Sequence, residues 1–334
     1  MVKVADVDAA SPSRREVVLH IGLPKTGSTA IQNWARANRV ALAAEGIFVL
    51  PPVMEAHRLA VECITNERRL RAPDIANICA LAYEDALAAL IQGASAPGVR
   101  LSFVSSEYFF PGDPQRAGAM FRNAGLTVTK VLCFVRRQDD LLASGYNQDV
   151  KRLGHAKPFV APGYLRTYDW GALREDWQAA FPEARIVLRN FDHHRKRGTL
   201  IGALASDMGA TSSHQQPATL TTNESLCAEL LEIVRTANAA GVTGISELAV
   251  EAQESGLTGI PFAFDPTVRE ALLAAYAASN ALIAEGDAHG EFADFALGGG
   301  ARRGADLTGN FPAEFAVRFM GWLAARGAKD ARTG

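Results

Sequence analysis

Short, nearly continuous apolar runs recur along the first two thirds of the chain, and polar or turn-forming residues bound them. Such runs are typical of strands buried on both faces of a parallel sheet, and helical spacing of apolar residues falls between most of them. The pattern predicts strands at 17–23, 46–52, 99–107, 126–136 and 184–191, and helices at 27–44, 75–92, 139–151 and 170–181. This alternation predicts an α/β fold of three layers, in which helices flank a mostly parallel central sheet.

Beyond residue 209 the strand pattern stops and helical spacing remains. Further helices are predicted at 221–241, 266–285 and 313–326, with a glycine-rich, flexible loop at 297–309. We therefore expect a flexible N-terminus at 1–15 and a single α/β domain at 16–334. Within that domain the core spans about 16–210 and a helical C-terminal part spans about 211–334.

Composition and charge narrow the function classes. The 334 residues carry a formal net charge of −2, which gives no global field for capturing nucleic acid, so an anionic ligand needs a local cluster. The first sixteen residues lack the apolar core of a signal peptide, and no apolar run is long enough for stable membrane insertion. Isolated cysteines predict reduced, buried thiols in a cytoplasmic protein. They are Cys63, Cys79, Cys133 and Cys227.

The stretch GLPKTGST at 22–29 joins the first predicted strand to the first predicted helix. Its glycines have the GxxxxG spacing of a Walker A loop, in which a lysine follows the second glycine and reaches the β- and γ-phosphates of a nucleotide. Here Ser28 occupies that position, and Lys25 lies inside the loop. Backbone amides, the helix start, the Lys25 charge and the hydroxyls of Ser28 and Thr29 still predict an anion site. The alternative is an ordinary strand–turn–helix whose serine caps the helix.

The segment PKTGST resembles the loop that binds the 5′-phosphosulfate in sulfotransferases that use 3′-phosphoadenosine 5′-phosphosulfate. That family has a P-loop fold in which the lysine precedes the glycine. The resemblance implies that the donor contacts Lys25, Thr26, Gly27, Ser28 and Thr29. It also implies an arginine at the end of a later strand and a serine eight residues further on, both binding the 3′-phosphate.

The stretch VLCFVRRQDDLLASGYNQ supplies this second motif with Arg136 and Ser144, about 110 residues beyond the loop. The planar fork of an arginine donates two hydrogen bonds to one phosphate. Taken alone, an arginine- and aspartate-rich helix start is usually a solvated cap, but its order and spacing relative to the loop favour a donor site. Less specific similarity to bacterial sulfotransferase-family proteins extends over roughly 17–241.

Cytosolic members of the family also carry an RKG-type segment near the C-terminus that contacts the 3′-phosphate. By this resemblance, the segment ARRGADLTG at 301–309 is the candidate for that contact, through Arg302, Arg303 and Gly304. The rest of this segment departs from the family pattern.

The resemblance implies in-line transfer of a sulfuryl group to a hydroxyl or amine of a glycan or small metabolite, with adenosine 3′,5′-bisphosphate as product and no metal required. It implies that Lys25 stabilises the charge that forms on the bridging oxygen. A general base should take the acceptor's proton. Glu107 and His57 are both candidates, because each follows a strand at the edge where open α/β sheets bind ligands. The alternatives are a surface charge at Glu107 and a plain helix-start residue at His57.

Two other functions remain open. A P-loop small-molecule kinase would place a lysine after the second glycine, and a non-catalytic nucleotide-binding relative would not need Lys25, Ser28, Thr29, Arg136 and Ser144 together. Of the remaining histidines, His20 is expected in the core, and HHRKRG at 193–198 is expected as a solvated basic turn. We predict no metal site and no nucleic-acid partner, and the oligomeric state is open.

Overall fold

The computed structural model describes residues 15–51, 55–65, 81–160, 163, 165–211, 225–287, 290–295, 304–307 and 312–333. They belong to two compact units, Met1–Val135 with Leu173–Leu220 and Arg136–Ala172 with Thr221–Gly334. Residues 136–172, which the apolar pattern places in the α/β core, therefore group with the C-terminal helices. The predicted flexible N-terminus lies outside the described residues, except for Arg15.

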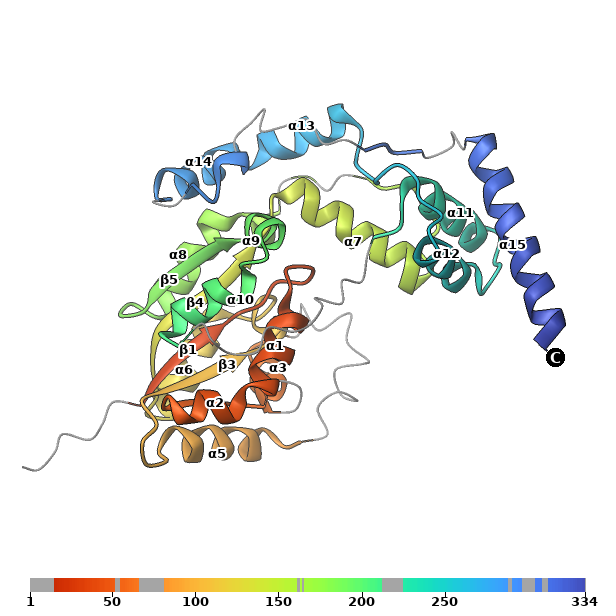
Figure 1. Ribbon diagram of the computed structural model, residues 1–334. Coiled ribbons are helices and arrows are strands. Elements are labelled where there is room, and N and C mark those ends of the chain that lie inside the picture. The colour runs from red at the N-terminus through yellow and green to blue at the C-terminus, as the bar shows by residue number, and fades with distance from the viewer. Residues whose placement is uncertain are drawn as a thin grey trace, which may run out of the picture. The chain divides into compact units, whose positions relative to one another are not determined.

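The first unit contains a five-stranded parallel sheet in the order β2–β3–β1–β4–β5 (Figure 1). The strands are β1 (Glu16–His20), β2 (Ile47–Val49), β3 (Leu101–Ser105), β4 (Thr127–Val135) and β5 (Arg185–Asn190). Each lies within one of the predicted strands, give or take one residue. The chain builds β2 and β3 on one side of β1 and then β4 and β5 on the other. The carboxyl end of β1 therefore lies where the strand order reverses, which is where open α/β sheets bind ligands.

Helices cover both faces of this sheet, which confirms the predicted three-layer α/β fold (Figure 1). On one face, α1 (Ser28–Ala37) and α10 (Leu200–Met208) bury Ile31 and Leu204 against alternate strand residues such as Phe103. On the opposite face, the ring of Phe48 in β2 packs against Gly93 of α5 (Tyr83–Ala94). Successive side chains of a strand point to opposite faces, which is why each strand serves both layers.

Two predictions for the first unit are corrected. The helix predicted at 27–44 is two helices, α1 and α2 (Arg39–Ala44), because the backbone of Asn38, with φ −100° and ψ 11°, departs from the helical values. The basic turn predicted at 193–198 is most of α9 (Phe191–Arg197). Asn190 caps α9 by accepting the amide of His193, and the side chain of His194 is buried.

Several short elements of the first unit were not predicted from the sequence. They are α3 (His57–Glu62), whose start at His57 was considered only as the alternative for that residue, the 3₁₀ turn η3 (Glu107–Phe109) and α6 (Pro114–Asn123). The first two follow strands β2 and β3, so their first residues lie at the carboxyl edge of the sheet.

The second unit is helical. Its elements are α7 (Gln138–Leu153), η4 (Arg166–Tyr168), α11 (Ala228–Ala239), α12 (Ile245–Glu254), α13 (Pro266–Ala275), α14 (Ala277–Glu285), η5 (Ala293–Phe295) and α15 (Ala313–Thr333). Helix α8 (Trp170–Ala180) begins in this unit and ends in the first. Val150 of α7, Leu230 of α11 and Phe319 of α15 belong to one buried cluster. The helix predicted at 266–285 is interrupted at Tyr276, whose ψ of 9° departs from the helical value.

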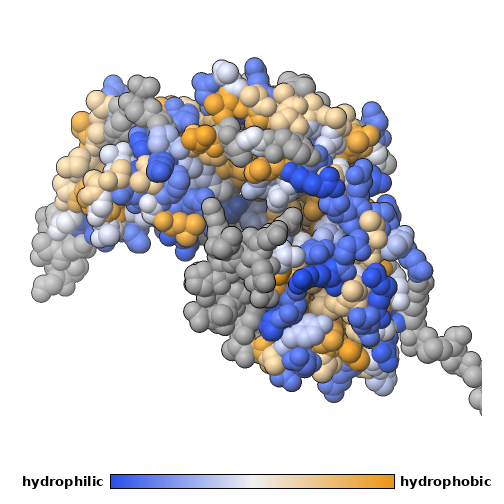
Figure 2. All heavy atoms as spheres, turned by 180° about the vertical axis from the view of Figure 1, so that it is seen from behind, coloured by the Kyte–Doolittle hydropathy of each residue, from blue (hydrophilic) through white to orange (hydrophobic). Residues whose placement is uncertain are grey.

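Surface residues of opposite character are mixed on the face shown in Figure 2, where orange residues lie among blue ones. Exposed apolar side chains such as Val40 are normal on a protein surface. Across the described residues, no helix combines the length and apolar character needed to cross a membrane. Cys63, Cys133 and Cys227 are buried and unpaired with one another, as predicted, whereas Cys79 lies outside the described residues.

Candidate active site

The loop between β1 and α1 is built on its two glycines. Gly27 has φ 82° and occupies the N-cap of α1, and a side chain there would meet Leu200 and Phe191 at 2.8 and 2.9 Å. A side chain at Gly22 would lie 2.5 Å from the Ser28 hydroxyl. The GxxxxG spacing is therefore required by close packing and by a left-handed backbone, whatever the loop binds.

Lys25 has φ 66°, and among the described residues it is the only non-glycine residue with a positive φ. This region is sparsely populated for a residue with a Cβ, and such residues concentrate at functional sites. The Lys25 side chain is half-buried. Lys25, the candidate named from the sequence, is thus also the non-glycine residue of the loop with a left-handed backbone.

The hydroxyls of the loop have a structural role here. Thr26 and Ser28 are buried, and both donate to the carbonyl of Leu23, at 2.8 and 3.1 Å. Thr29 is exposed in the first turn of α1, where backbone amides have no acceptor within the helix. The loop therefore combines a helix start with a lysine, which are components of an anion site, and the two hydroxyls hold its backbone in place.

Glu107 and His57, two separate candidates in the sequence, lie together at the carboxyl edge of the sheet. Strand β3 ends at Ser105, so Glu107 does not end the strand as predicted but begins η3. The reason is that the Ser106 hydroxyl accepts the amide of Tyr108 and caps the turn. His57 begins α3, and its Nε2 lies 4.0 Å from Oε2 of Glu107.

His57 is held as a neutral ring. Burial lowers its pKa, and the nearby Glu107 carboxylate offsets part of that shift. Its Nδ1 lies 2.8 Å from the Ser106 hydroxyl. The carboxylate opposite Nε2 favours a proton on that nitrogen, which leaves Nδ1 to accept from Ser106.

Glu107 is the more accessible member of this pair. Its side chain is 31% exposed, against 7% for His57. Oε2 accepts a hydrogen bond from Nε2 of Gln32 in α1 at 2.7 Å. From the described residues, no hydrogen bond reaches Oε1. That oxygen is therefore able to accept a proton from a ligand.

Two polar residues near the loop complete this edge. The structure confirms that His20 is a core residue, since its side chain is fully buried, burial lowers its pKa to about 3, and Nδ1 contacts the Ser105 hydroxyl at 2.8 Å. The prediction overlooked Gln32. Its signal in the sequence was a polar residue within the apolar stripe of Ile31, Trp34 and Ala35.

The second candidate motif lies in the second unit. Arg136 directly precedes the N-cap of α7, is half-buried, and accepts on its carbonyl from Nε1 of Trp170 at 2.9 Å. Ser144 is a half-buried residue of α7. The adjacent Arg137 is 1% exposed and is paired with both carboxylate oxygens of Asp139, at 2.7 and 2.8 Å. Arg137 therefore anchors the helix start through the carboxylate of Asp139.

The proposed RKG-like segment is described only at Gly304. A side chain there would approach Ala263 and Pro261 at 2.6 and 2.7 Å, so a close backbone contact in the second unit requires this glycine. Arg302 and Arg303 lie outside the described residues. Their contact with a donor remains a prediction.

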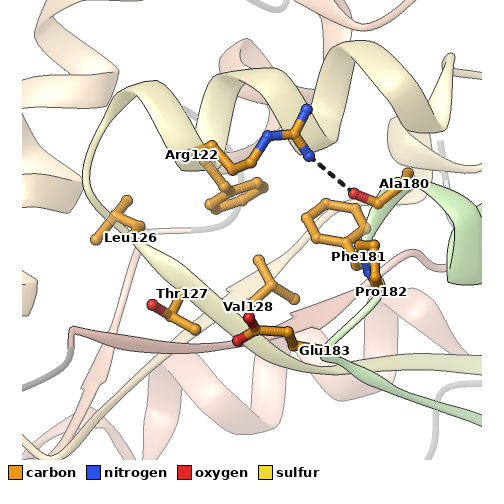
Figure 3. Close-up of a pocket in the computed structure, with 9 residues that line it drawn as sticks. Arg122, Leu126, Thr127, Val128, Ala180, Phe181, Pro182 and Glu183 are labelled. Atoms are coloured by element: carbon orange, nitrogen blue, oxygen red, sulfur yellow. Dashed lines mark hydrogen bonds between the residues drawn. The ribbon is translucent and has the colours of Figure 1, made fainter.

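A pocket of about 440 Å³ lies at the other edge of the sheet in the first unit (Figure 3). It is lined by residues that precede or begin β4 and β5, including Phe121, Leu126, Val128 and Phe181. The Arg122 guanidinium beside it donates to the carbonyl of Ala180 at 3.0 Å. This pocket contains none of the residues singled out in the sequence.

No group of three histidine, cysteine or acidic side chains that could hold a metal ion is found in the described part of the chain. No family model matches the chain. An uncharacterized protein of Archaeoglobus fulgidus is 34% identical over 92 residues, which are 27% of this chain and 24% of that protein. This chain thus aligns with about a quarter of that relative's length.

One solved structure, the sulfotransferase from Alicyclobacillus acidocaldarius, is similar at 15% identity and a TM-score of 0.46, over 83% of this chain and 95% of that chain. Neither likeness assigns an activity to this chain. The function therefore has to rest on the residues of the site.

Proposed function

We propose that this protein is a sulfotransferase that moves a sulfuryl group from 3′-phosphoadenosine 5′-phosphosulfate to a hydroxyl or amine of an acceptor. The observation that carries the proposal is the loop after β1. Its lysine lies between two glycines required by packing, at the start of α1, and has a left-handed backbone. A P-loop kinase has its lysine after the second glycine, where this chain has Ser28.

In the proposed reaction, the first turn of α1 and Lys25 bind the 5′-phosphosulfate. The bond from sulfur to the bridging phosphate oxygen breaks while a bond from sulfur to the acceptor atom forms. Negative charge grows on the bridging oxygen, and the Lys25 ammonium stabilises it there. Adenosine 3′,5′-bisphosphate leaves as the product.

Glu107 is the general base in this proposal. It is more exposed than His57, and Oε1 has no hydrogen bond from the described residues. His57 is neutral, and its Nδ1 is engaged by Ser106. The acceptor's proton therefore goes to Oε1 of Glu107, and the neutral His57 orients the carboxylate.

Arg136 and Ser144 bind the 3′-phosphate in this proposal. The support is the sequence resemblance, in which an arginine after a strand and a serine eight residues further on bind that phosphate. An arginine on a phosphate makes a charge-assisted, bidentate contact.

Thermal unfolding tests the proposal without knowledge of the acceptor. The protein is heated with adenosine 3′,5′-bisphosphate, with ATP and with AMP, each without added metal. A ligand that binds only the native state raises Tm by mass action, so the bisphosphate should raise it most. If only ATP raises the Tm, the protein is a kinase candidate. If the bisphosphate does not change the Tm, the sulfotransferase proposal is wrong.

The 3′-phosphate assignment has its own test. Arg136→Ala should raise the Kd of the bisphosphate by roughly 10- to 100-fold and leave the Kd of AMP, which lacks that phosphate, unchanged. Arg152→Ala, in an exposed position of α7, is the matched control. Equal weakening of both nucleotides by Arg136→Ala would assign Arg136 another role.

Turnover is followed as release of the bisphosphate from the donor. The acceptor panel offers a phenol, a sugar hydroxyl and an amine, because the site does not distinguish these classes. The acceptor with the highest kcat/KM then serves for the variants below.

A further inference from the structure

Gln32 is a buried polar residue of α1 with apolar buried neighbours. It is 7% exposed and lies between Ile31 and Trp34, which are 0% and 1% exposed. Burying an amide costs free energy unless it finds a hydrogen-bond partner. Its Nε2 donates to Oε2 of Glu107 at 2.7 Å, a short bond to a charged group.

The same oxygen of Glu107 is approached from two sides. Gln32 donates from α1, and His57 lies 4.0 Å away in α3. Glu107 itself begins η3, directly after Ser106, which caps that turn and contacts His57. Three elements that follow three different strands thus define where the carboxylate lies.

We propose that Gln32 is a positioning residue that fixes the Glu107 carboxylate relative to the loop after β1. This inference rests on the proposed function. With Oε2 bound by Gln32, Oε1 is left for the acceptor. Gln32 touches neither donor nor acceptor, so it acts on the reaction only through Glu107.

The helix makes this arrangement specific. Gln32 follows Ser28 by four residues in α1, which corresponds to about 6 Å along the helix axis. The anion-binding turn and the residue that holds the base therefore belong to one rigid element. Any shift of α1 relative to the loop moves the carboxylate with it, and misplacement of a reacting group by about 1 Å costs up to roughly 100-fold in rate.

The test compares Gln32→Met with Asn33→Met. The first removes the donor at similar length, and the second changes the exposed neighbour on the same helix. We expect Gln32→Met to lower kcat by roughly 10- to 100-fold, with donor KM and bisphosphate Kd within about twofold of the wild type. Asn33→Met should change none of these. If Gln32→Met does not fold, Gln32→Asn tests the same bond. Asparagine keeps the amide, but its side chain is one methylene shorter, so the amide no longer reaches Glu107.

A double-mutant cycle with Glu107→Gln separates positioning from a structural role. In the Glu107→Gln background, Gln32→Met should cause no further loss of kcat, because the group it positions is gone. Independent, multiplying losses would overturn the inference, and so would an equal loss of bisphosphate affinity. If the wild type binds the bisphosphate but Gln32→Met keeps full kcat, the positioning role of Gln32 is refuted and the proposed function is not. A wild-type protein that does not bind the bisphosphate would refute the proposed function instead.

Discussion

The two edges of the sheet in the first unit differ in kind. The carboxyl edge carries Lys25, whose backbone is left-handed, and the buried, neutral His57. It also carries the carboxylate of Glu107, which accepts a hydrogen bond from Gln32. At the amino edge, the chain carries a pocket of about 440 Å³ with mostly apolar walls (Figure 3). The comparison shows that available volume and reactive chemistry are separate properties. Parallel strands collect the polar residues that follow them at one edge, whatever the packing leaves open at the other.

The largest expected effect tests whether the carboxyl edge alone carries the reaction. Lys25→Ala should lower kcat by roughly 10³-fold, because it removes the charge that stabilises the leaving oxygen in the proposed reaction. Arg122→Ala at the amino edge should leave kcat within about twofold. Bisphosphate release at saturating donor measures both. A comparable loss in Arg122→Ala would mean that the edges are not separate.

The next effect concerns how tightly the loop is packed. Gly27→Ala should lower the free energy of unfolding by about 2–3 kcal/mol. The added Cβ is disfavoured by the left-handed backbone at this position, and it would overlap Leu200 and Phe191. Gly198→Ala is the matched control, because Gly198 also has a positive φ (65°) but no atom within 4 Å of the added Cβ. It should cost about 1 kcal/mol. Urea unfolding measures both, and equal losses would refute the packing role of Gly27.

A smaller effect is the acid sensitivity of the carboxyl edge. Burial lowers the pKa of His20 from 6.5 to about 3, so the folded state binds fewer protons than the unfolded state between these values. The stability that comes from burying neutral His20 is complete above pH 6.5 and is lost as pH falls toward 3, by about 1.4 kcal/mol per pH unit. Between pH 6.5 and 5 the loss should be about 2 kcal/mol.

The measurement is urea unfolding at several pH values. His20→Gln, which can still bond Ser105, should flatten the pH dependence of the free energy of unfolding. Parallel curves for the variant and the wild type would show that another group is responsible.

The smallest expected effect is at the amino edge itself. Glu183→Trp places a large ring beside the pocket, and we expect kcat and bisphosphate Kd to stay within about twofold of the wild type. Ligand titration and turnover check this. A marked loss in either would connect the pocket to the reaction.

Much of this unit follows from sequence patterns. All five strands were predicted because buried parallel strands leave continuous apolar runs, and the loop was predicted because its glycines and lysine are adjacent in the chain. Helix α9 was misjudged as a turn, since two turns of helix leave too few positions for a periodic pattern. Which of its residues are buried depends on the packing of α9 after β5, and they are Phe191, Asp192 and His194.

The contacts within the site were less predictable. Glu107 and His57 were each named from their position after a strand, but their pairing joins residues 50 positions apart. It depends on the Ser106 cap, which ends β3 early and turns Glu107 toward α3. Gln32 was visible as a polar residue on an apolar stripe, yet its partner is 75 positions away. Such pairs are fixed by tertiary packing rather than by local pattern.

The left-handed backbone of Lys25 also has a consequence for binding kinetics. A residue in that region persists only where the surrounding structure holds it, and its cost is borne when the chain folds. The donor anion of the proposed reaction would then meet a loop that is already shaped and would need no rearrangement to bind. Association should therefore be a single step whose observed rate rises linearly with ligand concentration, without levelling off at a rate of loop opening.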